Sequence, residues 1–242
     1  MNKDIILIFG GDGKIAKAIV KKYLDNNCIV IAVDKKTKSD TESFYENPNY
    51  NYYYADVTNI DQLTNLYTEI SNNFNYITHI ISAVGAPYPS EMDGILDITF
   101  EDIDNSIKLN LSSHIYVTKI FLPLLKTCNT SNRSIVLFSS VNAMKSFDLP
   151  AYSSGKSGLF GFMNSIVREV GKMNIRINII TPGTVATKQE VEKRYCNYKY
   201  KDMMALDQFT SPEDIADSVF FLTHITKAIT GKNIVVDSGQ IS

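Results

Sequence analysis

Short apolar runs alternate along this chain with longer segments of helical periodicity. Seven runs rich in β-branched residues have the length and composition of strands: Ile5–Phe9, Cys28–Val33, Tyr52–Ala55, Ile77–Ser82, Ser134–Ser139, Ile175–Ile180 and Asn233–Val236. Helical spacing of apolar residues falls between them, over Ile15–Leu24, Ile60–Phe74, Ile103–Leu125, Tyr152–Gly171 and Pro212–Thr223. Continuous apolar strands are buried on both faces. The alternation therefore predicts an α/β fold, a doubly wound parallel sheet of about seven strands with helices on both faces.

Composition and charge narrow the class of protein. The 242 residues carry 24 basic and 26 acidic side chains, for a net charge of −2, and 44% are hydrophobic. A chain of this length can bury a core without disulfides or metals, and we expect one domain over residues 1–242. The nearly balanced charge leaves no footprint for nucleic-acid binding. No apolar run approaches the roughly 20 residues of a membrane span, so we expect no membrane insertion.

The N-terminal residues and the cysteines indicate the compartment. Met1–Asp4 leads directly into an apolar strand, without the basic start and cleavage site of a signal peptide. Cys28, Cys128 and Cys196 are odd in number and widely spaced, which is typical of free thiols in a reducing cytosol. We therefore expect a cytoplasmic protein.

A glycine-rich segment follows the first expected strand and opens into the first expected helix. Glycines let the backbone turn tightly and approach a pyrophosphate, whose charge a helix N-terminus stabilises. The spacing fits a dinucleotide fingerprint read as Gly11-x-Gly13-x-x-Ala16 or as Gly10-x-x-Gly13-x-x-Ala16, although glycines at a strand end also form simple turns. We expect cofactor contacts along this loop, at Gly10, Gly11, Asp12, Gly13, Lys14 and Ile15.

An acidic residue ends the second expected strand. Asp34 lies close to the roughly 20-residue separation expected for a carboxylate that accepts the adenosine ribose hydroxyls. That carboxylate would repel a 2′-phosphate, so NAD is favoured over NADP. Lys35 and Lys36 follow and could pair with such a phosphate, which leaves NADP open, and a solvated Asp-Lys-Lys turn is the structural alternative. No Lys-Ser or Lys-Thr follows the glycines, which excludes a nucleoside-triphosphatase loop.

Tyr152 and Lys156 stand four residues apart in an expected helix, on one face and one turn apart. A tyrosine with a pKa near 10 is a poor base at neutral pH. An ammonium about 4 Å away at an effective dielectric near 20 would favour the phenolate by about 4 kcal/mol, or up to roughly three pKa units. We therefore expect a lowered pKa at Tyr152, suited to general acid–base catalysis.

These features belong to a longer ordered set, and together they resemble the short-chain dehydrogenase/reductase family, in the single-domain branch that includes carbonyl reductases and 3-oxoacyl-carrier reductases. The resemblance runs the whole length of the chain. Besides the glycine loop and the Tyr-Lys pair, it covers Asp56-Val57-Thr58, Asn110, Ser139-Ser140, the segment Asn174–Gly183, Thr187 and the tail Ile229–Gly239.

The resemblance implies roles for these positions. Tyr152 would be the acid–base residue, Lys156 would lower its pKa and hold the nicotinamide ribose, and a serine hydroxyl would bind the reacting oxygen. Asn110 would anchor a water that connects Lys156 to solvent. Cofactor contacts are further implied at Asp56, Val57, Ala83, Gly85, Pro182, Gly183, Val185 and Thr187. The hydride chemistry would belong to the cofactor.

The chain departs from the family pattern at several positions. Phe9 stands where a threonine is usual, Lys14 stands in place of the second glycine, and the Asn-Asn-Ala-Gly motif reads Ser82-Ala83-Val84-Gly85. Either Ser139 or Ser140 could be the catalytic serine: the usual separation from Tyr152 selects Ser139, whereas the strand end and Val141 select Ser140. We expect Ser140, with the loop that follows one residue short.

Histidines and cysteines give no metal motif in the sequence. His79, His114 and His224 lie on different elements, without cysteines or paired carboxylates at ligand spacing. We therefore expect no metal site and no thiol nucleophile.

The irregular stretch from about residue 184 to 208 is expected to be a substrate lid. One hypothesis from its charges is an anionic substrate, and the alternative is a solvated amphipathic lid. The lid's basic residues are Lys188, Lys193, Arg194, Lys199 and Lys201, interleaved with Tyr195, Tyr198 and Tyr200, and its acidic residues are Glu190, Glu192 and Asp202.

Three functions follow from these motifs. We expect a hydride-transferring oxidoreductase that uses NAD on the alcohol or carbonyl carbon of a small polar molecule. The alternatives are a 3-oxoacyl-carrier-protein reductase of fatty-acid type and a catalytically silent dinucleotide-binding regulator. The resemblance also implies a homotetramer or homodimer, and the helix from Gly158 to Val170 is apolar widely enough to support such packing.

Overall fold

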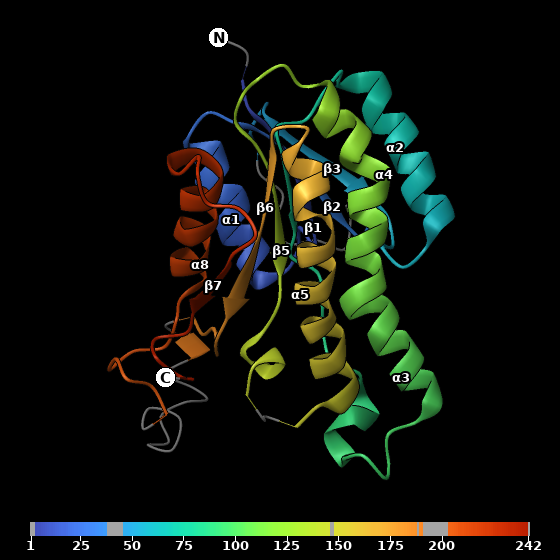
Figure 1. Cartoon of the computed structure of the whole chain (residues 1–242), viewed down its shortest axis with the longest axis vertical. Helices are drawn as coiled ribbons and strands as arrows, with labels where there is room; N and C mark the ends of the chain where they lie inside the picture. Colours follow the sequence, from blue (N-terminus) through green and yellow to red (C-terminus); the bar gives the residue numbers. More distant parts are fainter. Residues whose placement is uncertain (1–2, 38–45, 146–147, 188, 191–202, 242) are drawn as a thin grey trace.

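A seven-stranded parallel sheet forms the centre of the protein (Figure 1). The structure is a computed structural model that describes residues 3–37, 46–145, 148–187, 189–190 and 203–241. All neighbouring strands are parallel, in the order β3-β2-β1-β4-β5-β6-β7. The strands are β1 (Ile5–Phe9), β2 (Ile29–Asp34), β3 (Tyr50–Tyr54), β4 (His79–Ser82), β5 (Arg133–Phe138), β6 (Ile175–Pro182) and β7 (Asn233–Val236).

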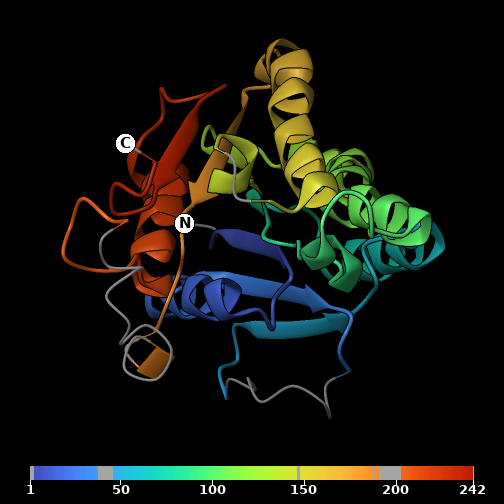
Figure 2. The ribbon, with the colours of Figure 1, turned by 90° about the horizontal axis from the view of Figure 1, so that it is seen from below.

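Helices cover both faces of this sheet. On one face lie α1 (Lys14–Asp25) and α8 (Pro212–Phe220). On the other lie α2 (Ile60–Asn73), α4 (Ser113–Thr127) and α5 (Pro150–Gly171). Figure 2 shows the two groups from below, with the sheet between them. The predicted α/β class, the doubly wound parallel sheet and its seven strands are confirmed.

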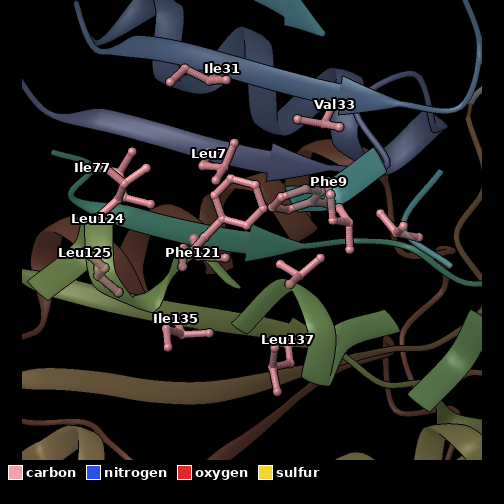
Figure 3. Close-up of a cluster of buried hydrophobic side chains, with 14 of the residues drawn as sticks. Leu7, Phe9, Ile31, Val33, Ile77, Phe121, Leu124, Leu125, Ile135 and Leu137 are labelled. Atoms are coloured by element: carbon pink, nitrogen blue, oxygen red, sulfur yellow. The ribbon is translucent and has the colours of Figure 1, made fainter. Parts of the chain in front are cut away.

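The alternation of side chains along β1 explains why both faces need cover. Leu7 and Phe9 point into the core beneath α2, α4 and α5, where the Phe9 and Phe121 ring centroids lie 5.2 Å apart (Figure 3). Ile6 and Ile8 point to the opposite face and pack under α1 and α8. Because every residue of β1 is buried, the strand reads as a continuous apolar run rather than an alternating one.

The long middle helix differs from the sequence expectation. The chain forms α3 (Phe100–Ile107), a π-helical turn (Lys108–Ser112) and α4, instead of one regular helix over Ile103–Leu125. Thr99 accepts a hydrogen bond from the Asp102 N–H and starts α3 earlier than predicted. The π-helical turn carries Asn110, and such turns are frequent at functional sites.

Two short 3₁₀ turns, at Pro89–Asp93 and Val141–Ala143, complete the described elements that border the site. Most of the expected lid, residues 188 and 191–202, falls outside the described part of the chain. Among the helices that the structure describes, none combines the length and the apolar character that a bilayer crossing requires.

Candidate active site

The carboxyl ends of β1 and β4 lie side by side, although the two strands are far apart in sequence. The chain turns from one half of the sheet to the other at this point, and doubly wound sheets bind their ligands there. A cavity of about 230 Å³ opens at this edge. Its lining includes Gly10, Gly13, Asp34, Lys35, Asp56, Val57, Ala83 and Gly85, which are mostly predicted cofactor contacts.

The glycine loop takes the tight course that the sequence predicts. Gly10 has φ +82°, and a Cβ there would stand 3.0 Å from the Ala83 carbonyl oxygen. Gly13 caps α1 with its backbone only, so the first N–H groups of the helix face the cavity without a side-chain partner. Lys14 and Ile15 are the first residues of α1. The loop therefore leaves backbone room and helix N–H groups for a pyrophosphate.

Asp12 and Asp34 have different surroundings. The Asp34 carboxylate lines the cavity and accepts a hydrogen bond of 3.0 Å from the Asp12 N–H. The Asp12 side chain is buried, and its carboxylate oxygens lie 3.1 Å from Lys17 Nζ and 2.6 Å from Lys36 Nζ. Lys36 thus ties the second strand to the glycine loop, while Lys35 lines the cavity beside Asp34. Of these two carboxylates, Asp12 is paired with lysines of the protein and Asp34 is on the cavity wall.

The ends of β3 and β4 form the opposite wall. Asp56 accepts hydrogen bonds from the Thr58 N–H and hydroxyl at 2.8 and 2.7 Å, which fixes the turn that carries Val57. Ala83 and Gly85 follow β4 and line the cavity. Gly85 has φ +140°, and a Cβ there would overlap the Lys156 ammonium group. The one glycine retained from the family motif is thus required where β4 meets α5.

Tyr152 lies in the first turn of α5, with its phenol held by a serine. The Ser140 hydroxyl hydrogen-bonds the Tyr152 phenol and also contacts Asn142. The Ser139 hydroxyl instead donates to the Lys156 carbonyl oxygen at 3.0 Å, in the interior. Of the two serines left open by the sequence, Ser140 is therefore the one beside the phenol.

The Lys156 ammonium group points into the protein. It donates to the carbonyl oxygens of Val84 and Phe138, both at 2.8 Å, and lies 6.0 Å from the centre of the Tyr152 ring. Burial lowers the pKa of Lys156 to about 7. The side chain therefore joins the ends of β4 and β5 to α5.

This placement changes the expectation for the phenol. Burial is the largest influence on Tyr152 and raises its pKa above the ordinary value; the Ser140 hydrogen bond lowers it and the charge of Glu91 raises it further. The lowering by Lys156 that the four-residue spacing suggested is absent from this conformation, because the ammonium group lies on backbone carbonyls.

Asn110 holds the segment that follows β4. Its amide nitrogen donates to the Ala86 carbonyl at 2.9 Å, and its amide oxygen accepts from the Ala86 N–H at 3.1 Å. His114, four residues on, lies fully buried with Nε2 3.4 Å from Lys156 Nζ. Sequence reasoning did not assign His114 to the site. Its spacing from Asn110 on one helix was the available signal.

Glu91 is a second site residue that the sequence did not reveal. Its carboxylate is fully buried and accepts hydrogen bonds from the Tyr152 N–H at 2.7 Å and from the Tyr88 N–H at 3.1 Å. It therefore caps the N-terminal end of α5 next to the phenol. The contact joins residues 61 positions apart, and no local pattern predicts it.

The segment after β6 contacts the first residue of α1, next to the glycine loop. Gly183 donates to the Val236 carbonyl, and Val185 pairs with Thr210 in an isolated bridge. Thr187 donates its N–H and hydroxyl to Glu190, and Glu190 forms an ion pair with Lys14 at 2.5 Å. The described start of the expected lid, at residues 184–187 and 189–190, is thus tied to the first helix through Glu190 and Lys14. Pro182 ends β6, just before it.

A second cavity, of about 620 Å³, is lined by residues that adjoin Ser140 and Tyr152 in the sequence. It is bordered by residues 91–95, 142–145, 148–150 and 153, so Glu91, Asn142 and Ser153 are in its wall. No sequence pattern predicted this cavity.

Comparison with known proteins decides the family. A family model described as enoyl-(acyl carrier protein) reductase matches residues 12–240. Carbonyl reductase family member 4 of Xenopus laevis is 28% identical over 236 residues, 97% of either chain. The 3-oxoacyl-[acyl-carrier-protein] reductase FabG of Buchnera aphidicola is 28% identical over 247 residues, 99% of this chain and 98% of that one. This chain belongs to the short-chain dehydrogenase/reductase family.

Solved structures of this family share the fold. A short-chain dehydrogenase from Leptospira borgpetersenii, solved with bound NAD⁺, superposes with a TM-score of 0.87 at 23% identity and covers 99% of this chain and 93% of its own. A short-chain dehydrogenase/reductase family oxidoreductase from Burkholderia thailandensis gives a TM-score of 0.87 at 24% identity, over 100% and 94%. These structures share the fold, and the family model over residues 12–240 confirms the family that the sequence motifs suggested.

Proposed function

We propose that this short-chain dehydrogenase/reductase transfers a hydride between NAD and the alcohol or carbonyl carbon of a small polar substrate, with Tyr152 as general acid and base. The hydrogen-bonded Ser140–Tyr152 pair carries the proposal. Asn142, which hydrogen-bonds Ser140, and Ser153, which follows Tyr152, line the 620 Å³ cavity. Two neighbouring hydroxyl groups can both hydrogen-bond one oxygen atom of a substrate.

A nicotinamide cofactor supplies or accepts the hydride when it is bound. In the direction of reduction, the Tyr152 phenol gives its proton to the carbonyl oxygen of the substrate. The Ser140 hydroxyl donates a hydrogen bond to the same oxygen and stabilises its growing negative charge. In oxidation, the Tyr152 phenolate takes the proton of the alcohol. Lys156 and Asn110 position the ends of β4 and β5 around this pair.

The wall of the first cavity favours NAD over NADP. Asp34 presents its carboxylate there, and a 2′-phosphate at the same place would be repelled. Lys36, which could have neutralised such a phosphate, forms an ion pair with Asp12. The bound NAD⁺ in the Leptospira borgpetersenii relative supports a nicotinamide cofactor. Lys35 on the cavity wall is the residue that would favour NADP.

An anionic substrate is the finer proposal, and its support is the basic composition of residues 188–201. Most of these residues lie outside the described chain. The described wall of the 620 Å³ cavity carries Asp93 and Asp148 as well as Lys145, and thus adds no excess of positive charge. The salt dependence of KM tests the proposal, because an anion site weakens as ionic strength rises. A KM that is independent of salt would oppose it.

The second candidate function is reduction of a 3-oxoacyl group on a carrier protein. The names of the relatives from Buchnera aphidicola and Mus musculus favour it. Asp34 opposes it, since we expect that activity to use NADPH. The third possibility, a silent dinucleotide-binding regulator, gives no reason for the buried Ser140–Tyr152 pair.

Cofactor titration tests the proposal directly. We expect NADH to bind more tightly than NADPH, and Asp34→Ala to reduce this preference. Asp104→Ala, a loss of one carboxylate in α3 and away from the cavity lining, is the matched control. Alcohols, sugars and a 3-oxoacyl thioester are then compared as substrates with the preferred cofactor. Equal or tighter NADPH binding with turnover of the thioester would favour the second function.

The family branch also suggests assembly as a homotetramer or homodimer through α4 and α5. Light scattering coupled to size exclusion measures the mass of the assembly directly. A monomer at all protein concentrations would oppose this part of the proposal.

A further inference from the structure

Four side chains able to bind a metal meet at the amino end of the sheet, the edge opposite the cofactor cavity. Asp4 precedes β1, Cys28 precedes β2, and His79 is the first residue of β4. His224 comes from the π-helical turn Phe221–Ile225 that follows α8. The sequence analysis treated these histidines as scattered. Parallel pairing of β1 with β4 and packing of the turn against β5 bring them together.

The distances within this cluster suit one metal ion. His224 Nε2 lies 3.3 Å from Asp4 Oδ2 and 3.7 Å from Cys28 Sγ. The ligand atoms of Asp4, His79 and His224 all lie within 4.8 Å of one another. Tetrahedral zinc with its usual bond lengths separates nitrogen and oxygen ligands by about 3.3 Å and nitrogen and sulfur ligands by about 3.5 Å. The Asp4–His224 contact already has this spacing, and the other ligand atoms, Cys28 Sγ among them, would move closer together when the ion binds.

His79 supplies the observation that points to a ligand. Its Nδ1 is 2.8 Å from the Ser134 hydroxyl, while its Nε2 is fully buried and has no hydrogen-bond partner within the described chain. An unpartnered polar atom in the interior is costly, and a bound ion is one of the few ways to satisfy it. The rings of His79 and His224 lie 5.0 Å apart, and one ring nitrogen of each belongs to the cluster.

A hydroxyl group contacts one ring nitrogen of each imidazole. His224 Nδ1 lies 2.8 Å from the Thr223 hydroxyl, which matches the Ser134 contact of His79. A hydrogen-bond partner on one ring nitrogen sets the orientation of the imidazole, so that the other ring nitrogen can bind a metal. Burial lowers the pKa of His79 to about 3, so its ring is neutral and carries a lone pair. The Asp4 side chain is 34% exposed and leaves a route of entry from solvent.

We propose that Asp4, His79, His224 and Cys28 bind a Zn²⁺ ion that links the N-terminal segment, the starts of β2 and β4 and the turn after α8. Two imidazoles, one carboxylate and one thiolate form a ligand set that zinc prefers, and calcium or magnesium would require more oxygens. On binding, Cys28 gives its thiol proton to solvent, and two negative ligands balance the charge of the ion. The ion is structural, since all four protein ligands close the shell.

Titration of the full chain with Co²⁺ and then Zn²⁺ tests the proposal. After treatment with a chelator, we expect one equivalent of Co²⁺ to bind, with the visible absorption bands of a tetrahedral ion that include a thiolate charge-transfer band. Zn²⁺ should displace it and raise the melting temperature. Asp4→Asn keeps the shape of a partly exposed side chain, and it should weaken binding at least about tenfold. His224→Gln should do the same.

The two described cysteines provide a matched pair. Cys28→Ser should remove the thiolate band and weaken binding, whereas Cys128→Ser, a buried cysteine outside the cluster, should change neither. Absence of saturable binding of either ion to the wild-type chain would overturn the proposal. So would tight binding that Asp4→Asn and His224→Gln both leave unchanged, since the ion would then lie elsewhere.

Discussion

Glu91 offers a sharp test of how the fold sets the reactivity of Tyr152. Its buried carboxylate accepts the N–H groups of Tyr152 and Tyr88, and its charge raises the pKa of the Tyr152 phenol. Glu91→Gln removes the charge but keeps the shape and one acceptor. The phenol should then lose a proton more readily, so the rise of the alcohol-oxidation rate with pH should move to lower pH.

The stability cost follows from the same contacts. Glu91→Gln leaves one of the two N–H groups without an acceptor, which costs about 1–2 kcal/mol, and Glu91→Ala leaves both, which costs about 2–4 kcal/mol. For a chain of this size each kcal/mol lowers the melting temperature by about 2–4 °C. We therefore expect Glu91→Ala to lose roughly twice as many degrees as Glu91→Gln.

The pH–rate profile and thermal unfolding of both variants are measured together. Glu101→Gln, an exposed charge loss in the first turn of α3, is the control and should change neither quantity. A profile of Glu91→Gln that stays in place, or moves to higher pH, would refute the electrostatic link. Unchanged unfolding of both Glu91 variants would refute the capping role.

Three further predictions concern the residues around the phenol. Gly85→Ala should abolish activity and reduce stability, because the new Cβ would overlap the Lys156 ammonium group and φ at this position is +140°. Urea unfolding measures the loss of stability, and a midpoint equal to that of wild type would contradict the prediction. Ser140→Ala should lower kcat by about 10²–10³-fold, whereas Ser139→Ala should act mainly on stability, and equal kcat losses would contradict the assignment. The folded pKa of Lys156 is lowered to about 7 from 10.5, so the unfolded chain binds more protons between these values and stability should rise with pH there. In Lys156→Met the urea midpoint should rise less steeply with pH over this range. The same pH dependence as wild type would contradict the lowered pKa of Lys156.

The parallel sheet and its number of strands could be predicted because strands that are buried on both faces are continuous apolar runs in the sequence. Ile5–Phe9 is a strand with the bounds that its apolar run predicts, since both faces of β1 are covered. The helix start at Ser211 also follows local rules, because its side chain accepts from the Asp214 N–H in a capping box. The bounds of this strand and the start of this helix depend on residues that are close together in the sequence.

The site was predicted less completely, because its decisive contacts are long-range. Glu91 reaches Tyr152 across 61 positions, and the direction of the Lys156 side chain depends on carbonyls of two separate strands. Spacing on one helix placed Tyr152 and Lys156 on one face but could not say that the ammonium group lies on those carbonyls. The meeting of His79 with His224 likewise depends on tertiary packing that no sequence spacing reports.

The central claim is that the Tyr152 phenol moves the proton during hydride transfer. Tyr152→Phe removes one oxygen atom and keeps the ring, so single-turnover oxidation of NADH and NADH binding can be compared in the same variant. The account predicts that turnover falls by at least about 10²-fold, while the Kd for NADH stays within a few-fold of wild type. Wild-type turnover in Tyr152→Phe would contradict the account.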